Sequence, residues 1–424
     1  MRTFSRCWFL AFFAMVQDPS LVDIGRLEAF PNAFTRNRKL NFLSTLLTII
    51  DVGRESTSLK LGRLCKHFGI KGDAVMAVSQ QAFSKARAKI SEAPIRVIFE
   101  RQIENEYQGK MSRLPLRSGD GWSYLAIDGT KISLPNLPQL RERFFSTGAG
   151  ASSPTALGSC LLDIGNRRII DAMLLERLDE RACAADHLKR YAQLRPGDEK
   201  SMFLLDRGYP SLELFRHFMA LGYYYLMRCR AKFNVAIDAL PAGCDEVITI
   251  KGTPVRVLKV VLSTGEVETL VTNDFERDGA EFMDLYSMRW DIEGAYAMLK
   301  TRIQLENFTG KTENSIRQDF WATILAATMI LVLEEDVDEA IRKEREGRDN
   351  KWEYQMNVNK FVGIMKDDLI HAFTARSKLM LVHRMNKIVR RARRFVCPVK
   401  PGRKVERAKN KRKVAYHHNR KSNC

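Results

Sequence analysis

The spacing of apolar residues changes along the chain, and each change predicts a different kind of element. Between residues 20 and 115 the apolar positions recur at helical intervals, which predicts a mostly helical N-terminal part. Short apolar runs with turn residues follow at 116–230 and predict an alternation of strands and helices. Residues 231–279 indicate short strands separated by turns, and residues 315–345 indicate another apolar helix.

Two of the strand-like runs carry an aspartate. Residues 122–134 surround Asp128 with apolar neighbours, and residues 201–205 lead directly into Asp206. The other strands and helices of this part are expected at residues 157–163, 168–176, 181–194, 212–221 and 223–229, with insertion strands at 247–251, 253–261 and 266–273. An aspartate after a strand most often belongs to a turn, so neither residue identifies a site by itself.

Residues 280–305 predict one amphipathic helix. Its apolar positions share one face, namely Leu285, Met288, Ile292, Ala295, Tyr296, Leu299 and Ile303. The polar residues beside this stripe, within an arc of about 60°, are Tyr286, Arg289, Glu293 and Lys300. A carboxylate flanked by two cations and a phenol suits a metal next to a phosphate backbone. The alternative is a solvated face with an i,i+4 ion pair between Arg289 and Glu293.

Two short helices joined by a connection are expected at residues 58–69 and 78–89. Ser79 is placed to cap the second helix at its N-terminus. The polar side of that helix carries Gln80, Gln81, Lys85 and Arg87. Phe83 lies on the opposite side, so the pair resembles a helix-turn-helix whose second helix contacts DNA. A generic pair of helices is the alternative.

The charge balance indicates a polyanionic partner. The 424 residues include 69 Lys and Arg against 50 Asp and Glu, which gives a net charge of +19 and a pI of about 9.6. Such an excess favours nucleic acid first and an anionic membrane surface second. Residues 384–424 hold 16 Lys and Arg against one acid, Glu406. We expect this basic tail to make nonspecific phosphate contacts, although a disordered, solvated segment has the same composition.

Cysteine usage and the N-terminal residues bear on cellular location. The eight cysteines are scattered without a CxxC pair or a histidine cluster, so we expect no zinc site and reduced thiols in the cytoplasm. Residues 1–16 place two arginines before an apolar run that resembles a short signal segment, but no clear cleavage site follows. We interpret them as a buried segment or as an extension upstream of the true start. No other apolar run is long enough to span a bilayer.

The spacing on the 280–305 helix is specific enough to compare with known families. Tyr-x2-Arg-x3-Glu-x6-Lys, at residues 286–300, resembles the motif of the insertion-sequence-four (IS-4-like) transposases, bacterial cut-and-paste enzymes of the Asp-Asp-Glu class. Asp128-Gly-Thr and Asp206-Arg-Gly-Tyr match the two aspartate motifs of that family. The resemblance implies a ribonuclease-H-like α/β core with a β-rich insertion at 231–279. In such a core the two aspartates converge and the later helix brings Glu293 to them.

The resemblance also implies a set of catalytic and metal-binding carboxylates, which are Asp128, Asp206 and Glu293. Oxygen donors of this kind suit Mg²⁺ or Mn²⁺. Two such ions about 4 Å apart activate a water or a 3′-hydroxyl and stabilise the leaving oxygen. The motif positions that hold the terminal nucleotides near the cut are occupied by Tyr286, Arg289 and Lys300.

Together these patterns predict a DNA transposase in three parts. Residues 1–115 are expected to form a helical N-terminal domain, 116–345 the catalytic domain, and 346–424 a helical and then basic C-terminal region. The resemblance implies metal-dependent cleavage at terminal inverted repeats and joining of the 3′-hydroxyl end to target DNA, and we expect a homodimer in a synaptic complex. The partner is double-stranded DNA and not a membrane, and the expected location is the bacterial cytoplasm, in association with the nucleoid. The alternatives are a nuclease of the same fold without strand transfer and a non-catalytic, domesticated DNA-binding protein.

Overall fold

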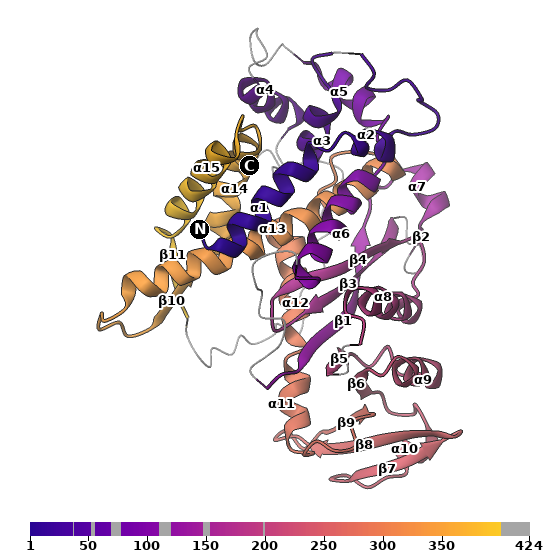
Figure 1. Cartoon of the computed structure of the whole chain (residues 1–424). Coiled ribbons are helices and arrows are strands. Elements are labelled where there is room, and N and C mark those ends of the chain that lie inside the picture. The colour runs from indigo at the N-terminus through magenta and orange to yellow at the C-terminus, as the bar shows by residue number, and fades with distance from the viewer. Residues whose placement is uncertain are drawn as a thin grey trace. The chain divides into compact units, whose positions relative to one another are not determined.

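The chain divides into two compact units (Figure 1). The computed structural model describes residues 1–36, 38–51, 56–68, 78–109, 120–146, 153–197 and 200–399. One unit, called here the helical unit, comprises Met1–Gln102, Ser133–Thr155 and Met298–Cys424. The other, the sheet unit, comprises Ile103–Ile132 and Ala156–Ala297. These units do not follow the boundaries expected at residues 115 and 345, because most of the N-terminal part and the whole C-terminal part fall in the same unit.

A mixed β-sheet forms the centre of the sheet unit. Its first strands are β1 (Ser123–Ser133), β3 (Pro154–Asp163), β4 (Arg168–Leu175), β5 (Ser201–Leu205) and β6 (Tyr224–Cys229). β4 pairs with β3, and the order continues β3-β1-β5-β6. β3 and β4 are antiparallel, whereas β5 runs parallel to both β1 and β6. This order and these directions fit the ribonuclease-H-like core that the sequence predicts.

Helices cover both faces of this sheet. Figure 1 shows α8 (Glu180–Leu194) and α9 (Leu212–Ala220) on one face, and α11 (Glu281–Ser287) and α12 (Trp290–Ala297) on the other. Every residue of β3 and β5 is buried as a result. A strand covered on both faces reads as a continuous apolar run rather than an alternation, which explains the pattern of residues 201–205.

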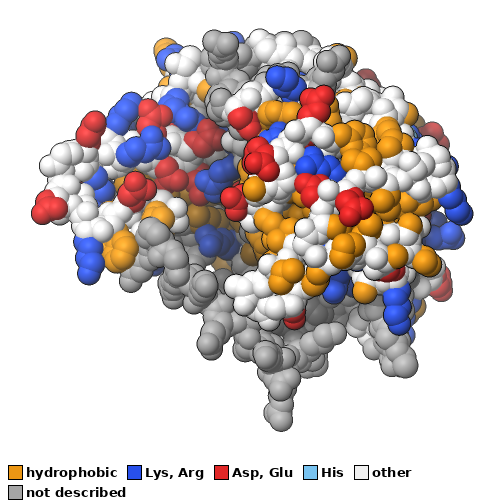
Figure 2. Space-filling view, turned by 90° about the horizontal axis from the view of Figure 1, so that it is seen from below, with side chains coloured by type: hydrophobic (Ala, Val, Ile, Leu, Met, Phe, Trp, Pro, Cys, Tyr) orange, Lys and Arg blue, Asp and Glu red, His pale blue; other side chains and the backbone are white. Residues whose placement is uncertain are grey.

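The insertion extends the sheet at its far edge. It consists of α10 (Val235–Asp238), β7 (Asp245–Ile250), β8 (Thr253–Val261) and β9 (Val267–Thr272). β9 pairs antiparallel with β6, and β8 and β7 follow in antiparallel order. The predicted β-rich insertion is therefore confirmed. Seen from below in Figure 2, hydrophobic side chains gather on the face where the insertion lies, and Val247, Val261 and Val267 are exposed.

The helical unit is built around the 33-residue helix α13 (Glu313–Arg345). Its N-terminal helices are α1 (Thr3–Val16), α2 (Ser20–Gly25), α3 (Phe42–Ile50), α4 (Thr57–Phe68), α5 (Gln80–Arg87) and most of α6 (Ala93–Tyr107). In the sequence, α7 (Pro138–Arg143) and β2 (Phe145–Ser146) come between the two segments that form the sheet unit. β2 pairs with the first residues of β3. The C-terminal elements are η1 (Met298–Arg302), β10 (Glu353–Met356), α14 (Val358–Phe373), α15 (Lys378–Ala392) and β11 (Val396–Val399). The basic residues from 400 onward lie outside the described part of the chain.

Residues 3–16 form a helix with one buried, aromatic face. Trp8, Phe9 and Phe12 of α1 are fully buried, and the ring of Phe12 lies 4.5 Å from that of Phe373 on α14. Arg2 anchors the start of the helix through an ion pair to Asp336 of α13 at 2.7 Å. The interpretation as a buried segment is therefore confirmed. Across the described residues, no helix has the length and apolar character needed to cross a membrane.

The two helices expected at 58–69 and 78–89 are present as α4 and α5. The Ser79 hydroxyl accepts a hydrogen bond from the Ala82 backbone N–H at 3.1 Å, which confirms Ser79 as the N-cap of α5. Phe83 is buried, as the amphipathic pattern predicts. Gly69 and the connection up to residue 77 lie outside the described residues.

Candidate active site

The register of two parallel strands brings Asp128 and Asp206 together. β1 and β5 pair from Ser123 opposite Ser201 to Ala126 opposite Leu204. Continued by two residues, this register sets Asp128 opposite Asp206. Side chains alternate between the faces of a sheet, so residues in register point to the same face. The Asp206 carboxylate is fixed at the end of β5 because its Oδ1 accepts the Gly208 N–H at 2.7 Å.

The surroundings of Asp128 disfavour its negative charge. Burial and the nearby Asp206 carboxylate raise the pKa of Asp128 to about 7, and Glu180 acts in the same direction. The Gly129 N–H, which donates to Asp128 Oδ1 at 2.9 Å, and the Arg289 guanidinium oppose this shift. A bound cation would reduce the electrostatic repulsion among the carboxylates of Asp128, Asp206 and Glu180.

The helix predicted over residues 280–305 is interrupted. α11 ends at Ser287 and α12 begins at Trp290. Between them the N–H groups of Arg289 and Asp291 donate to carbonyl oxygens three residues back, which makes a tighter turn than an α-helix has. A π-helical turn, η1, follows α12. The prediction of one continuous helix is therefore wrong, because a local change of helical pitch leaves the apolar spacing almost unchanged.

Arg289 links Asp128 of β1 to Glu293 of α12. Its Nη2 lies 2.9 Å from Glu293 Oε1, and its Nη1 lies 3.9 Å from Asp128 Oδ2. The side chain is only 9% exposed. Among the described residues, its Nε has no hydrogen-bond partner. The i,i+4 ion pair with Glu293 is thus present, but its guanidinium is buried beside Asp128, while the Glu293 side chain remains 41% exposed.

This geometry belongs to a segment with known relatives. Residues 123–329, which contain all three carboxylates, match the family described as "Transposase DDE domain". Residues 123–329 are a transposase DDE domain. The family that the Tyr-Arg-Glu-Lys motif predicts is therefore confirmed for this domain.

Individual relatives cover different shares of the chain. The transposase InsG for insertion sequence element IS4, from Escherichia coli (strain K12), is 24% identical over 278 residues, 60% of this chain and 60% of its own. The protein y4zB of Sinorhizobium fredii (strain NBRC 101917 / NGR234) is 30% identical over 79 residues, 19% of this chain and 22% of its own. The chain thus spans less than two thirds of the length of either relative.

A solved structure also resembles the chain. It is the piggyBac transposase synaptic complex with hairpin DNA, with a TM-score of 0.49 and 11% sequence identity, covering 90% of this chain and 85% of the other. The fold itself follows from the strand order β4-β3-β1-β5-β6.

The donor set of the transposase domain suits a hard divalent cation. Asp128 and Asp206 offer carboxylate oxygens, the ligands that Mg²⁺ and Mn²⁺ prefer, and their mutual repulsion would fall on binding. Among the described residues, however, no group of three His, Cys, Asp or Glu side chains converges closely enough to hold a metal. Glu293 is bonded to Arg289 instead, so it would have to exchange this partner to join the aspartates.

The other residues of the motif lie in different surroundings. Tyr286 is buried on α11, where burial raises the pKa of its hydroxyl to about 12, and its ring centroid lies 5.7 Å from the Arg289 guanidinium. Trp290 is 48% exposed and lies against the same guanidinium at 5.3 Å. Lys300 belongs to the helical unit, where its Nζ lies 3.8 Å from Glu306 Oε1 and burial lowers its pKa.

The residues expected to contact DNA on α5 fall into two groups. Gln80, Gln81 and Lys85 are exposed, and the Gln80 amide donates to the Ser58 hydroxyl of α4. Arg87 differs from the expectation because its guanidinium is buried and lies 3.0 Å from Asp319 Oδ1 of α13. A side chain already held by a buried carboxylate is not available to a phosphate, so we withdraw Arg87 from the DNA-binding residues.

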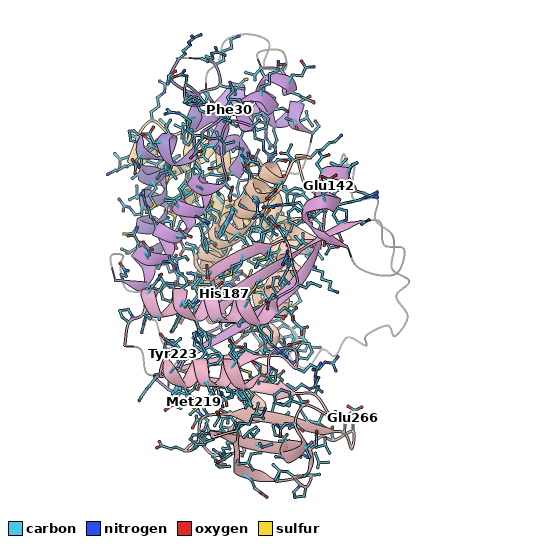
Figure 3. All side chains as sticks on the ribbon, turned by 90° about the vertical axis from the view of Figure 1, so that its right-hand side faces the viewer. Phe30, Glu142, His187, Met219, Tyr223 and Glu266 are labelled. Atoms are coloured by element: carbon cyan, nitrogen blue, oxygen red, sulfur yellow. The ribbon has the colours of Figure 1, made fainter. Side chains whose placement is uncertain are left out.

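A buried hydrogen-bond network of polar side chains supports the strand that carries Asp128. His187 of α8, labelled in Figure 3, places Nδ1 2.7 Å from Asp171 Oδ2 and Nε2 3.0 Å from Ser159 Oγ. Ser159 Oγ in turn lies 3.4 Å from the Asp128 carbonyl oxygen, which also accepts the Tyr296 hydroxyl. Sequence analysis missed this hydrogen-bond network, because a serine and an aspartate on a hairpin and a histidine on a helix have no diagnostic spacing.

Proposed function

We propose that the chain is a DNA transposase that cleaves at the terminal inverted repeats of its element and joins the resulting 3′-hydroxyl to target DNA. The observation that carries this proposal is the register of Asp128 and Asp206 within a transposase DDE domain, with Glu293 linked to Asp128 through Arg289. The similarity to InsG, a transposase for an insertion sequence element, supports the same assignment.

In this proposal the three carboxylates would hold Mg²⁺ or Mn²⁺, two ions in the expected mechanism. The ions would supply an activated oxygen nucleophile and stabilise the leaving oxygen of the cut strand. The protein's contribution is to hold the carboxylates in place through strand register and through the hydrogen bonds to Gly129 and Gly208. Before a cation binds, Arg289 keeps Glu293 close to Asp128.

Arg289 is also a candidate phosphate contact. Its Nε is buried without a partner among the described residues, and a phosphate oxygen would accept this donor. A phosphate bound there would compete with Glu293 for the guanidinium and free the carboxylate for a cation. Tyr286 packs against Arg289 and would position it, while Lys300 remains a second candidate contact with the terminal nucleotides.

Recognition of the element ends falls to the helical unit in this proposal. Gln80, Gln81 and Lys85 form an exposed polar row on α5, capped by Ser79, as the second helix of a helix-turn-helix requires. The basic residues after Val399 would add sequence-independent contacts to double-stranded DNA. Because an element has two equivalent ends, a symmetric dimer is the expected assembly.

The proposal is tested by cleavage of labelled element-end DNA. The purified full chain is incubated with the inverted repeats that flank its gene, with Mg²⁺ and with EDTA. Glu293→Ala should abolish cleavage while end binding, measured by gel shift, is retained. Asp291→Ala, which removes an exposed acid from the same turn of α12, is the matched control and should cleave like the wild type.

Other outcomes separate the alternatives. Cleavage without joining of the 3′-end would favour a nuclease of the same fold. Binding without cleavage by the wild type would favour a domesticated DNA-binding protein. Loss of end binding in Glu293→Ala equal to its loss of cleavage would make Glu293 structural and contradict the assignment.

A further inference from the structure

A fourth carboxylate, Glu180, lies beside the two catalytic aspartates. Glu180 is the first residue of α8, whose N-cap is Asp179. A methyl group placed on Gly208 would lie 3.1 Å from Asp206 Oδ1 and 3.3 Å from Glu180 Oε2, so the two carboxylates border the same point. A methyl group on Gly129 would lie 3.0 Å from Glu180 Oε1. Glu180 therefore contacts the backbone next to both aspartates.

The two glycines explain why a carboxylate fits there. Gly129 directly follows Asp128, and Gly208 lies two residues after Asp206. A larger residue at either position would occupy the space that the Glu180 side chain now takes. The Asp-Gly and Asp-Arg-Gly patterns thus have a steric reason, which is to leave room for the Glu180 side chain beside Gly129 and Gly208.

The charges of the three groups are coupled. Burial and then the Asp206 carboxylate raise the pKa of Glu180, with Lys131 opposing the shift. Glu180 and Asp206 both raise the pKa of Asp128. Three carboxylates that repel one another in a partly buried place cost stability unless a cation compensates them.

A second and independent observation indicates a ligand at this place. Tyr209 is fully buried, and within the described parts of the chain its hydroxyl has no hydrogen-bond partner. Burial raises the pKa of Tyr209, and Asp128, Glu180 and Asp206 act in the same direction, while Tyr209 itself directly follows Gly208 in the chain. A buried hydroxyl without a partner is costly, so a polar ligand is expected to satisfy it.

We propose that Glu180 is a fourth carboxylate of the cation-binding centre, and that the Tyr209 hydroxyl donates a hydrogen bond to the hydration shell of the bound divalent cation. This inference depends on the proposed function, since it adds a residue to the same centre. Among the described residues no three carboxylates converge closely enough to hold a metal in this structure, so the side chains would have to turn toward the cation when it binds. It assigns Glu180 to the side of the aspartates formed by α8, where no residue of the Tyr-Arg-Glu-Lys motif lies.

The test is Mn²⁺ binding by the full chain, measured by calorimetry and by electron paramagnetic resonance of the free ion. Glu180→Gln should weaken binding by about ten-fold or more, as changes around a metal site commonly do. Asp206→Asn should weaken it as well. Glu213→Gln, which removes an exposed acid from the first turn of α9, is the matched control and should leave binding unchanged.

Thermal melting without divalent cations separates this role from a structural one. Glu180→Gln should melt at the same temperature as the wild type or higher, because one of three repelling charges is gone. Tyr209→Phe should also keep its melting temperature, because the hydroxyl it loses has no partner, yet it should bind Mn²⁺ more weakly.

Two results would overturn the inference in different ways. If Asp206→Asn loses Mn²⁺ binding while Glu180→Gln binds like the wild type, the fourth carboxylate is refuted and the proposed function stands. If the wild type and Asp206→Asn bind Mn²⁺ equally, the centre itself is not where we place it, and both proposals fail.

Discussion

His67 and His371 face each other in the helical unit, where burial works against their charge. Their ring centroids are 4.8 Å apart, on α4 and α14. Burial and then His371 lower the pKa of His67 from its ordinary value of 6.5 to about 4, and Lys66, Arg384 and Arg63 act in the same direction. Burial also lowers the pKa of His371. The folded chain therefore holds His67 neutral over a range where the unfolded chain protonates it.

This difference predicts an acid-sensitive contribution to stability. Between pH 6.5 and about 4 the unfolded state binds more protons at His67, so the free energy of unfolding falls as the pH falls through this window. His67→Gln should flatten the fall, measured as urea midpoints at pH 7 and pH 5. His383→Gln, at an exposed position on α15, should leave it unchanged. An equally steep fall in His67→Gln would contradict the assignment.

Single residues also mark how far sequence reasoning reaches. Asp128, Asp206 and Glu293 could be predicted because each belongs to a pattern of several residues at fixed spacing. Glu180 could not, since an acid in the first turn of a helix is common and its proximity to Gly129 and Gly208 arises only in the folded sheet. The same limit applies to the hydrogen-bond network that links the side chains of Ser159, His187 and Asp171.

Among the elements, α5 depends on α13 for its position. The Arg87 guanidinium at the end of α5 donates to Gln318 Oε1 at 2.6 Å, to the Ser315 carbonyl at 2.7 Å and to Asp319 Oδ1 at 3.0 Å. The helical wheel of residues 78–89 placed Arg87 with the exposed glutamines. A helical wheel contains no information about a partner 232 residues away in the chain. The kind of element was therefore predictable, and its anchoring was not.

Breaking this anchor should cost much more than changing the exposed face. Arg87→Ala leaves the Asp319 carboxylate buried without its cation and should reduce the free energy of unfolding by about 3–5 kcal/mol. The double variant with Asp319→Ala should cost less than the sum of the two single variants, because neither charge is then stranded. Lys85→Ala, on the exposed side, should change stability little. Simple additivity in urea unfolding would refute the coupling.

At the scale of the whole molecule, the basic charge is concentrated at the C-terminus. Of the 16 Lys and Arg between residues 384 and 424, ten follow Val399, and only Glu406 opposes them. Residues 384–392 belong to α15, which packs through Leu381, Met385 and Ile388, and β11 pairs with β10. A deletion that begins at residue 384 would therefore damage the fold. The region that can be tested separately begins at residue 400.

Truncation after Val399 should flatten the salt dependence of DNA binding. Each phosphate contact that is lost reduces the slope of log K against log salt by about 0.9 for duplex DNA. A full-length variant with Gln at the ten Lys and Arg positions after Val399 is the matched control, and should behave like the truncation if charge alone is responsible. Binding measured from low to moderate salt with an unchanged slope would remove this region from the interface.

The register of β1 and β5 has a consequence for how copies of such a gene lose function. Asp128 reaches Asp206 only because both lie the same distance beyond the last paired residues. One extra codon between Ser123 and Asp128 would shift the carboxylate by one position and turn it to the opposite face of the sheet. Such an in-frame insertion keeps every motif residue and the reading frame intact. A genome survey that counts complete motifs would therefore overestimate the number of mobile copies, unless it also checks the length of each strand.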